Sequence, residues 1–167
     1  MQISIRTART EDTEAILDLM VRVINATVEL PYRADMIENV TQNLTVWHRE
    51  PDECFHFIAE DGSKVVGVIL VKAFWNLCSL FVRPEWQHNG IGRQLVHAAI
   101  DACRDRSPKQ AIYLNAAPSA VSFYRGLGFT SKESSQQLPT GFQAMQLALV
   151  PATPNPSFKR TRLRRSA

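Results

Sequence analysis

The sequence predicts an α/β domain built on one mixed β-sheet with helices on both faces. Three observations support this fold class. Short β-rich runs alternate with amphipathic helical patterns in the order β-α-α-β-β-β-α-β-α-β. Residues 77–115 have a strand–helix–strand pattern, which makes the two strands parallel and joins them by a right-handed crossover. Two β-rich runs around Asp61-Gly62 form an antiparallel hairpin.

Length and composition agree with one domain over residues 1–150. The 167 residues are 45% apolar and 21% charged, as in ordinary globular proteins, and a chain of this length buries on the order of 70% of its unfolded surface. No apolar run of about 18 residues exists to span a membrane, and the N-terminus has no secretory signal, so we expect a cytoplasmic protein. The three cysteines form no CxxC pair, so we expect free thiols and no metal site.

The first 50 residues contain one predicted strand and two predicted helices. Alternating apolar and polar residues predict a strand over Ile3–Ala8. Thr10 or Asp12 is expected to cap the helix that follows. The apolar stripe of that helix consists of Ile16, Leu17, Met20, Val23 and Ile24. Pro31 is expected to interrupt the chain before a second helix, predicted over Ala34–Arg49 from a weaker pattern.

The middle of the chain contains the hairpin, a third β-rich run and a helix. The hairpin strands are predicted over Phe55–Glu60 and Lys64–Lys72, and the third strand over Leu77–Val82. A helix is predicted over Ile91–Arg104, because apolar residues recur there at helical spacing. These apolar residues are Leu95, Val96, Ala99, Ile100, Ala102 and Cys103.

The last elements are a short strand, a helix and a final strand. The apolar run Ala111–Asn115 predicts a buried strand. Pro118 suits the first turn of the next helix, and Gly126 and Gly128 suit its C-terminal end. A last strand is predicted over Phe142–Val150.

Residues 151–167 differ from the rest of the chain. They include no acidic residue, three prolines and five basic residues: Lys159, Arg160, Arg162, Arg164 and Arg165. The segment has no apolar periodicity, so we expect a basic, disordered tail. The remaining 14 basic and 16 acidic residues leave the body slightly acidic, which argues against a specific nucleic-acid site beyond the charge of the tail.

The segment "SLFVRPEWQHNGIGRQLV" (Ser79–Val96) has two glycines where the predicted helix Ile91–Arg104 begins. Glycine costs about 1 kcal/mol relative to alanine in a helix. Without side chains at Gly90 and Gly92, the backbone N–H groups of Asn89 to Arg93 are accessible donors. The helix dipole adds positive charge to them. The sequence therefore predicts an anion site for a phosphate or pyrophosphate, with Arg93 at its rim.

Three known phosphate-binding motifs have glycines in a similar arrangement. A P-loop requires Gly-Lys-Ser/Thr, but Arg93 and Gln94 follow Gly92. A dinucleotide-binding fingerprint requires a third glycine where Leu95 stands. The pattern Gln/Arg-x-x-Gly-x-Gly/Ala is matched completely by "QHNGIG", residues 87–92.

At these residues the sequence resembles the GNAT superfamily of N-acetyltransferases. "LFVRPEWQHNGIGRQLV" is similar to the acetyl-coenzyme A signature of that family, and "LNAAPSAVSFYRGLGF" (Leu114–Phe129) is similar to its second signature. The resemblance extends over about residues 3–150, including the order of the elements. It implies a GNAT-like fold with a splayed parallel strand pair and acetyl-CoA as the cosubstrate.

The resemblance also implies which residues hold the cosubstrate. Strand Leu77–Val82 is implied to carry a bulge and to splay from strand Ala111–Asn115. The opened edge leaves backbone groups of Leu80, Phe81 and Val82 for the pantetheine amides.

The pyrophosphate is implied to lie on the glycine loop, whose residues are Gln87, His88, Asn89, Gly90, Ile91, Gly92 and Arg93. His88 is either an exposed loop residue or a contact of the adenosine phosphate. Asn115 matches the position that holds the pantetheine arm, and Ser119 or Ser122 could reach the same arm.

For the chemistry, the resemblance implies direct attack of an amine on the thioester. A strand amide, expected to be that of Phe81, would polarise the thioester carbonyl. Tyr124 matches the tyrosine near the sulfur, and a phenol suits the protonation of a departing thiolate.

No residue is assigned as the base. Some family members place a glutamate on the strand that here carries Asn76, Cys78 and Ser79. Other candidates near the acceptor are Glu29, Tyr32 and Glu60. A water chain, or an amine that arrives neutral, would need no base.

The acceptor is expected to be a primary amine of a small molecule or a protein. The resemblance implies that residues 26–35 and 135–145 flank it. The missing base keeps open an alternative, a non-catalytic acyl-CoA sensor, against which Tyr124 argues. The sequence leaves the oligomeric state open, a homodimer included.

Overall fold

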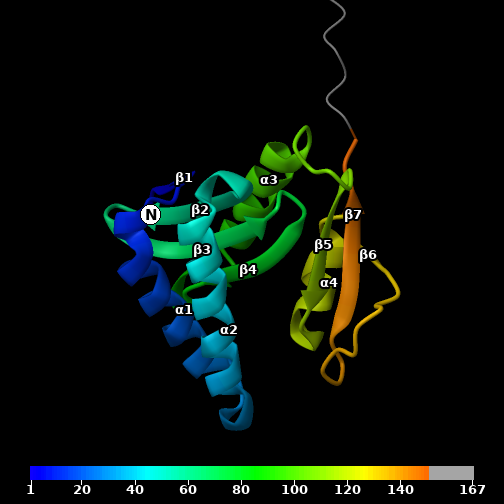
Figure 1. Ribbon diagram of the computed structural model, residues 1–167. Coiled ribbons are helices and arrows are strands. Elements are labelled where there is room, and N and C mark those ends of the chain that lie inside the picture. The colour runs from blue at the N-terminus through cyan, green and yellow to red at the C-terminus, as the bar shows by residue number, and fades with distance from the viewer. Residues whose placement is uncertain (151–167) are drawn as a thin grey trace, which may run out of the picture.

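Seven strands of residues 1–150 form one sheet, in the order β1-β2-β3-β4-β5-β7-β6 (Figure 1). The computed structural model describes residues 1–150, and the tail predicted for 151–167 lies outside the described residues. Neighbouring strands are antiparallel except β4 and β5, which run parallel. The predicted mixed sheet is confirmed.

The strands and helices lie close to their predicted positions. The strands are β1 (Ile3–Thr7), β2 (Cys54–Asp61), β3 (Lys64–Lys72), β4 (Asn76–Val82), β5 (Ala111–Ala116), β6 (Thr130–Ser131) and β7 (Gln143–Ala148). The helices are α1 (Thr13–Thr27), α2 (Leu30–Arg49), α3 (Ile91–Cys103) and α4 (Val121–Gly126). The prediction omitted β6, because a two-residue strand has no recognisable hydrophobic pattern. Within residues 1–150, no helix has the length and apolar composition needed to cross a membrane.

Two details of the first helices differ from the prediction. Pro31 lies in the first turn of α2, where its missing N–H removes no helical hydrogen bond. It therefore starts the helix and does not interrupt the chain. The Asp12 side chain does not cap α1, because its two oxygens bind the Arg6 guanidinium at 2.8 and 2.9 Å. Thr10 lies in a short 3₁₀ turn that precedes the helix.

The helices α1 and α2 pack on one face of the sheet (Figure 1). The buried residues of α1 are Ile16, Leu19, Met20, Val23 and Ile24. Leu19 takes the place predicted for Leu17, which is only half-buried. Both belong to the apolar stripe by spacing, but the face that meets β3 is centred on Leu19 and Met20.

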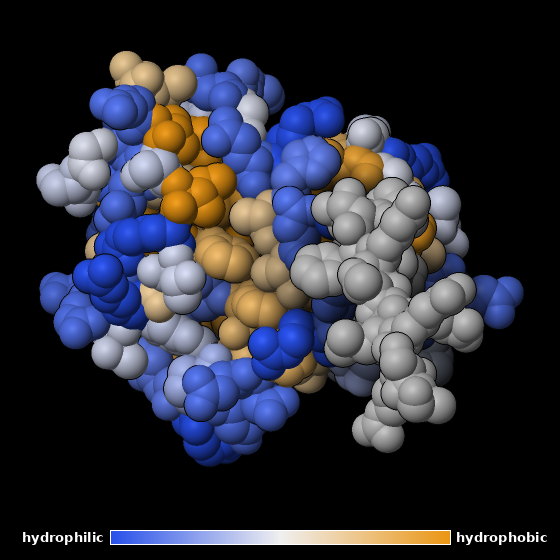
Figure 2. Space-filling model, turned by 90° about the horizontal axis from the view of Figure 1, so that it is seen from above, coloured by the Kyte–Doolittle hydropathy of each residue, from blue (hydrophilic) through white to orange (hydrophobic). Residues whose placement is uncertain are grey.

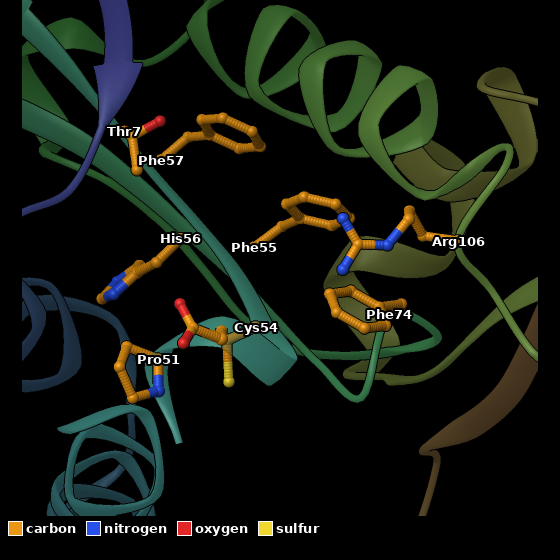
Figure 3. Close-up of a pocket in the computed structure, with 9 residues that line it drawn as sticks. Thr7, Pro51, Cys54, Phe55, His56, Phe57, Phe74 and Arg106 are labelled. Carbon is orange, nitrogen blue, oxygen red and sulfur yellow. The ribbon is translucent and has the colours of Figure 1, made fainter. Parts of the chain in front are cut away.

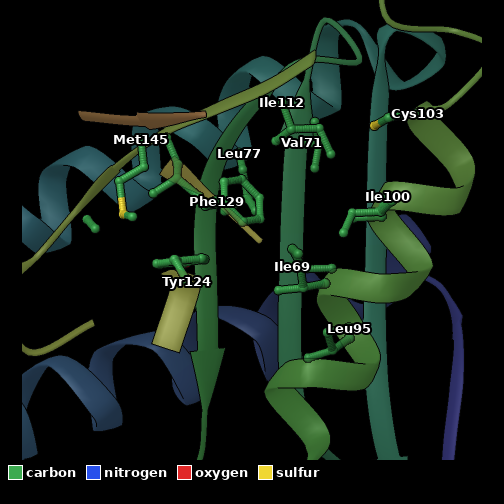
Figure 4. Packing of buried hydrophobic residues seen from close by; sticks show 14 of the residues in the cluster. Ile69, Val71, Leu77, Leu95, Ile100, Cys103, Ile112, Tyr124, Phe129 and Met145 are labelled. Carbon is green, nitrogen blue, oxygen red and sulfur yellow. The ribbon is translucent and has the colours of Figure 1, made fainter. Parts of the chain in front are cut away.

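The helices α3 and α4 pack on the opposite face, which confirms helices on both faces (Figure 4). The buried residues of α3 are Ile91, Leu95, Val96, Ala99, Ile100 and Cys103. Ala102, predicted for this stripe, is half-buried. Tyr124 of α4 and Phe129 join the same core, together with inward residues of β3, β4, β5 and β7.

The strands β4 and β5 diverge directly after they meet. Asn76 and Tyr113 form their one paired position within residues 1–150. Next to it, Cys78 is an extra residue of β4 in the ladder with β3, and such a bulge bends a strand. The predicted bulge and splayed parallel pair are confirmed, and the site is built around this divergence.

Candidate active site

Residues 88–93 comprise the end of the loop between β4 and α3 and the first turn of α3, and they carry a row of unpaired backbone N–H groups. The first hydrogen bond of α3 runs from the Gln94 N–H to the Gly90 carbonyl, at 3.0 Å, and within residues 1–150 no N–H of residues 88–93 has an acceptor. Gly90 has a φ of +78°, a left-handed conformation that favours glycine. Free N–H groups at a helix start, with exposed Arg93 beside them, are an arrangement suited to binding an anion.

Side chains of the same loop hold its backbone in place. The Gln87 amide Nε2 donates to the Val82 carbonyl at 3.0 Å. The Asn89 amide Nδ2 donates to the carbonyls of Trp86 and Gln87, at 3.2 and 3.0 Å. These bonds occupy carbonyls and leave the backbone N–H groups free. His88 is exposed and has a φ of +62°, which is uncommon for a residue other than glycine.

Gly92 serves a purpose different from that of Gly90. A Cβ atom at Gly92 would lie 3.4 Å from the Phe123 ring and 3.8 Å from the Val82 side chain. Phe123 belongs to α4 and Val82 to β4. Glycine therefore preserves the narrow space between these two elements, and its backbone conformation is an ordinary helical one.

The register between β3 and β4 decides which backbone groups of β4 face the opening. Opposed residues of an antiparallel pair alternate between exchanging both hydrogen bonds and exchanging none. The Arg83 N–H donates to the Val66 carbonyl at 2.9 Å, and the register opposes Phe81 to Val68. Phe81 therefore bonds to β3, and the groups of Leu80 and Val82 point away from it. The expectation of a free Phe81 amide is wrong for this reason.

Tyr124 is almost wholly buried in the core between the sheet and α3 and α4, with 7% of its surface exposed. Its ring lies between those of Phe123 and Phe129, at centroid distances of 5.1 and 5.5 Å. Burial alone raises the pKa of its hydroxyl, and no group within residues 1–150 hydrogen-bonds that hydroxyl. Tyr124 is therefore both a packing residue and a protonated phenol at neutral pH.

The other predicted cosubstrate contacts lie on β5 and the elements that follow it. Asn115 is exposed, beyond the single position at which β5 pairs with β4. Ser119 and Ser122 are exposed at the start of α4. These three residues thus lie on the β5 side of the opening, opposite the β4 edge.

A hollow of about 300 Å³ adjoins the junction of β4 and β5. Its lining includes Trp75, Asn76, Lys109, Tyr113, Asn115, Lys132 and residues 133–136. It thus includes the junction residues and part of the segment 135–145 that was predicted to flank the acceptor. The other predicted segment, residues 26–35, does not line it.

The three candidate bases do not line this hollow. Glu60 lies on β2, and its carboxylate binds the Arg6 guanidinium at 2.8 Å. Glu29 and Tyr32 are exposed where α1 meets α2. Glu133 is the one carboxylate among the described lining residues, and no sequence pattern indicated it.

The cysteines are free thiols, as predicted. Cys78, in the β4 bulge, donates through its Sγ to the Leu70 carbonyl at 3.5 Å, and burial raises its pKa to about 12. Burial also raises the pKa of Cys103 to about 12. A thiol with so high a pKa is a poor nucleophile at neutral pH. Within residues 1–150, no three His, Cys, Asp or Glu side chains are grouped to hold a metal ion.

A larger cavity, of about 660 Å³, lies at the edge of β2 (Figure 3). Phe55, Phe57 and Phe74 form its apolar wall, and the Arg106 guanidinium carbon lies 4.4 Å from the centroid of the Phe74 ring. Apolar surface also crosses the middle of the face seen in Figure 2, between hydrophilic rims. None of the residues predicted for the cosubstrate lines this cavity, so its size does not make it the candidate active site.

His56 is a buried polar residue that the sequence did not indicate. It is 2% exposed, and its ring lies edge-on to that of Trp47 at a centroid distance of 4.2 Å. Neither ring nitrogen has a partner within residues 1–150, and burial lowers its pKa to about 3. It is a neutral core histidine of the α1–α2 layer, not a base for the reaction.

Comparisons with known proteins bear on the family of this chain. The family described as acetyltransferase (GNAT) domain matches residues 32–149. The peptidyl-lysine N-acetyltransferase YjaB of Escherichia coli is 27% identical over 158 residues, which cover 91% of this chain and 100% of that protein. The chain spans 44% of one further curated relative and 78% to 84% of two others.

Two solved structures share the fold. The PaiA N-acetyltransferase of Thermoplasma acidophilum, in complex with coenzyme A, has a TM-score of 0.72 at 20% identity, covering 87% of this chain and 98% of that one. YncA of Salmonella typhimurium, solved with acetyl-CoA, has a TM-score of 0.68 at 21% identity, covering 93% and 99%.

Proposed function

Because the chain belongs to the GNAT acetyltransferase family and is an acetyl-CoA-dependent N-acetyltransferase, we propose that it acetylates a primary amine by direct attack, with Tyr124 as the general acid. The row of free N–H groups at residues 88–93, beside an opened strand edge, is the observation that supports this proposal most. It provides an anion site and a pantetheine track in one continuous surface.

Binding of acetyl-CoA is assigned to backbone groups. The N–H groups of residues 88–93 hold the pyrophosphate, and Gln87 keeps the loop in place through the Val82 carbonyl. The backbone groups of Leu80 and the N–H of Val82 face the opening and bind the pantetheine arm, with Asn115 on the opposite side. Ser119 or Ser122 can contact the same arm.

The reaction forms one bond and breaks one. The neutral amine nitrogen attacks the thioester carbonyl carbon, and the Leu80 N–H, which replaces Phe81 in this role, donates to the oxygen that becomes negative. Collapse of the intermediate breaks the carbon–sulfur bond, and the Tyr124 hydroxyl gives its proton to the thiolate. The nitrogen releases its surplus proton to water, and water returns a proton to the Tyr124 phenolate, so no net proton is gained or lost. Burial raises the pKa of Tyr124, so the phenol is protonated at neutral pH when the thiolate forms.

Direct attack is favoured over an acyl-enzyme because of the environment of Cys78. It is the thiol that lies on β4 itself, but its pKa of about 12 leaves it protonated at neutral pH. Transfer through Cys78 would need a thiolate, and burial disfavours that form.

Peptide lysines are the first acceptors to test. Support comes from the similarity to YjaB, which carries the name peptidyl-lysine N-acetyltransferase and is matched over its whole length. Purified protein is mixed with acetyl-CoA and a panel of lysine peptides and small amines, and released thiol and acetylated product are measured. Acetylation of at least one amine is expected. Tight coenzyme A binding without transfer to any amine would contradict the proposal and favour the non-catalytic sensor.

A further inference from the structure

We propose that the hollow beside the β4–β5 junction binds the acceptor and selects amines that carry an anionic group, which Lys109 and Lys132 recognise. This inference rests on the proposed function, because it names the substrate class of the same site. It concerns the specificity of the acceptor and assigns no further step to the reaction.

Two lysine ammonium groups surround the Tyr113 ring in this hollow. The Lys132 Nζ lies 4.3 Å from the ring centroid and the Lys109 Nζ lies 5.3 Å from it. The Lys109 Nζ also lies 3.6 Å from the centroid of the Trp75 ring. Aromatic faces attract cations, so the two rings hold both ammonium groups over the hollow.

Neither ammonium group is neutralised by a neighbouring carboxylate. Among residues 1–150, every ion pair within 4.0 Å involves other residues. Glu133 lines the same hollow but pairs with neither lysine. Both ammonium groups lie within 5.3 Å of the same ring centroid, so their positive charges add in this hollow and favour a bound anion.

The turn that carries Trp75 has an unusual backbone, and contacts with Tyr113 hold Trp75 beside the hollow. Ala73 and Phe74 have φ angles of +51° and +62°, in the left-handed region that favours glycine. Residues stay in such conformations where surrounding contacts hold them, often at ligand sites. Here the Trp75 carbonyl accepts the Tyr113 N–H at 2.8 Å, and the two rings meet edge to face at 5.7 Å.

The position of the hollow suits an acceptor. Asn76 and Tyr113 line it and form the closed end of the divergence between β4 and β5. Leu80, proposed for the thioester, lies four residues further along β4, about 13 Å on an extended strand. An amine separated from its anion by a chain of several atoms therefore reaches from the lysines to the thioester.

The charges of Lys109 and Lys132 also repel acceptors whose far end carries a second ammonium group, so polyamines are expected to be poor substrates.

Three acceptors of one length test the proposal. Acetyl transfer is measured with 6-aminohexanoate, hexylamine and 1,6-diaminohexane, which end in a carboxylate, a methyl group and an ammonium group. We expect kcat/KM to fall in that order, and the preference to shrink as salt is added. A second pair of acceptors consists of lysine peptides with glutamate or glutamine next to the lysine. It tells whether a free or a peptide-borne carboxylate is preferred. A preference for the anionic acceptor in either set supports the proposal.

Charge variants assign the preference to the two lysines. Lys109→Gln and Lys132→Gln should each reduce kcat/KM for the anionic acceptor about two- to fivefold, and the double variant about tenfold, with the methyl-ended acceptor unchanged. Lys132→Arg retains the charge and should keep the preference. Lys64→Gln is the matched control, because Lys64 also lies over an aromatic ring, that of Trp86, at 4.4 Å, but outside the hollow.

The inference and the proposed function fail in different ways. Transfer to all acceptors with equal kcat/KM, or equal losses for all of them in the double variant, would overturn the anion preference and leave the acetyltransferase assignment standing. Coenzyme A binding with no transfer to any amine would overturn the proposed function, and this inference with it.

Discussion

At the scale of single residues, burial has opposite effects on the pKa values of two ionisable side chains. Tyr124 and His56 are both almost wholly buried, and neither has a hydrogen-bond partner within residues 1–150. Burial favours the uncharged form of each, so it raises the pKa of Tyr124 and lowers that of His56. Tyr124 therefore keeps a proton that it can donate, whereas His56 cannot accept one near neutral pH.

Tyr124→Phe is expected to lower kcat by about 10²-fold or more while coenzyme A affinity changes little. The ring and its contacts with Phe123 and Phe129 remain, so the thermal midpoint should stay nearly the same. Steady-state kinetics and calorimetric titration check both. The loss should shrink with an acyl donor whose leaving thiol is more acidic. Full activity of the variant with acetyl-CoA would show that Tyr124 only packs.

The stability of the protein is expected to fall as the pH is lowered from 7 to 5, because of His56. Its pKa is about 3 when folded and about 6.5 when unfolded, so below pH 6.5 the unfolded chain takes up a proton that the folded chain does not. The loss at pH 5 amounts to about 2 kcal/mol of unfolding free energy.

Urea unfolding of His56→Leu at both pH values checks this origin. The variant should lose most of the dependence between pH 7 and 5. Asp12, whose pKa the Arg6 guanidinium lowers to about 2, weakens the fold only below about pH 4 and does not interfere. An unchanged slope in the variant would assign the effect to other groups.

At the scale of elements, the candidate site lies where β4 ends and where α3 and α4 begin. The bulge at Cys78 turns β4 away from β5, and the register leaves the backbone groups of Leu80 and the N–H of Val82 unpaired on that side within residues 1–150. The two glycines before and within α3 then act separately. Gly90 supplies a left-handed turn, and Gly92 keeps α3 close to Phe123.

Gly92→Val is expected to reduce coenzyme A affinity at least tenfold with the fold retained. Its methyl groups would extend beyond a Cβ that already lies 3.4 Å from Phe123, into the space between β4 and α4. Gly92→Ala is the matched control, since its single methyl group makes only an ordinary contact and should be tolerated. Calorimetric titration measures affinity and circular dichroism the fold. Equal coenzyme A affinity in the wild type and the Val variant would show that the space beside Gly92 is not needed for binding.

At the scale of the whole molecule, two cores share one sheet. One lies under α1 and α2, and the other lies between the opposite face of the sheet and α3 and α4. The buried residues of both extend from Ala8 to Leu149. The Leu149 N–H donates to the Gln110 carbonyl at 2.8 Å and so closes the second core.

A chain that ends at Val150 is therefore expected to keep the thermal midpoint and coenzyme A affinity of the full chain. Leu149→Ala in the same shortened chain should lower stability by about 2–5 kcal/mol, since it removes a buried side chain. Thermal unfolding and calorimetric titration compare the three proteins. Unfolding of the shortened chain, or loss of coenzyme A binding, would show that residues 151–167 contribute to the domain.

The sequence by itself determined the elements and the glycine loop before α3, because both depend on neighbours along the chain. Alternation over residues 64–72, helical spacing over 91–103 and the glycines of the loop are local signals. Only the tertiary structure decided in which direction the backbone N–H of Phe81 points. That direction depends on the pairing of β4 with β3 and on the bulge at Cys78. It also decided the burial of His56 under Trp47. Lys109 and Lys132 meet at Tyr113 for the same reason: chain segments distant in sequence come together only when the sheet forms.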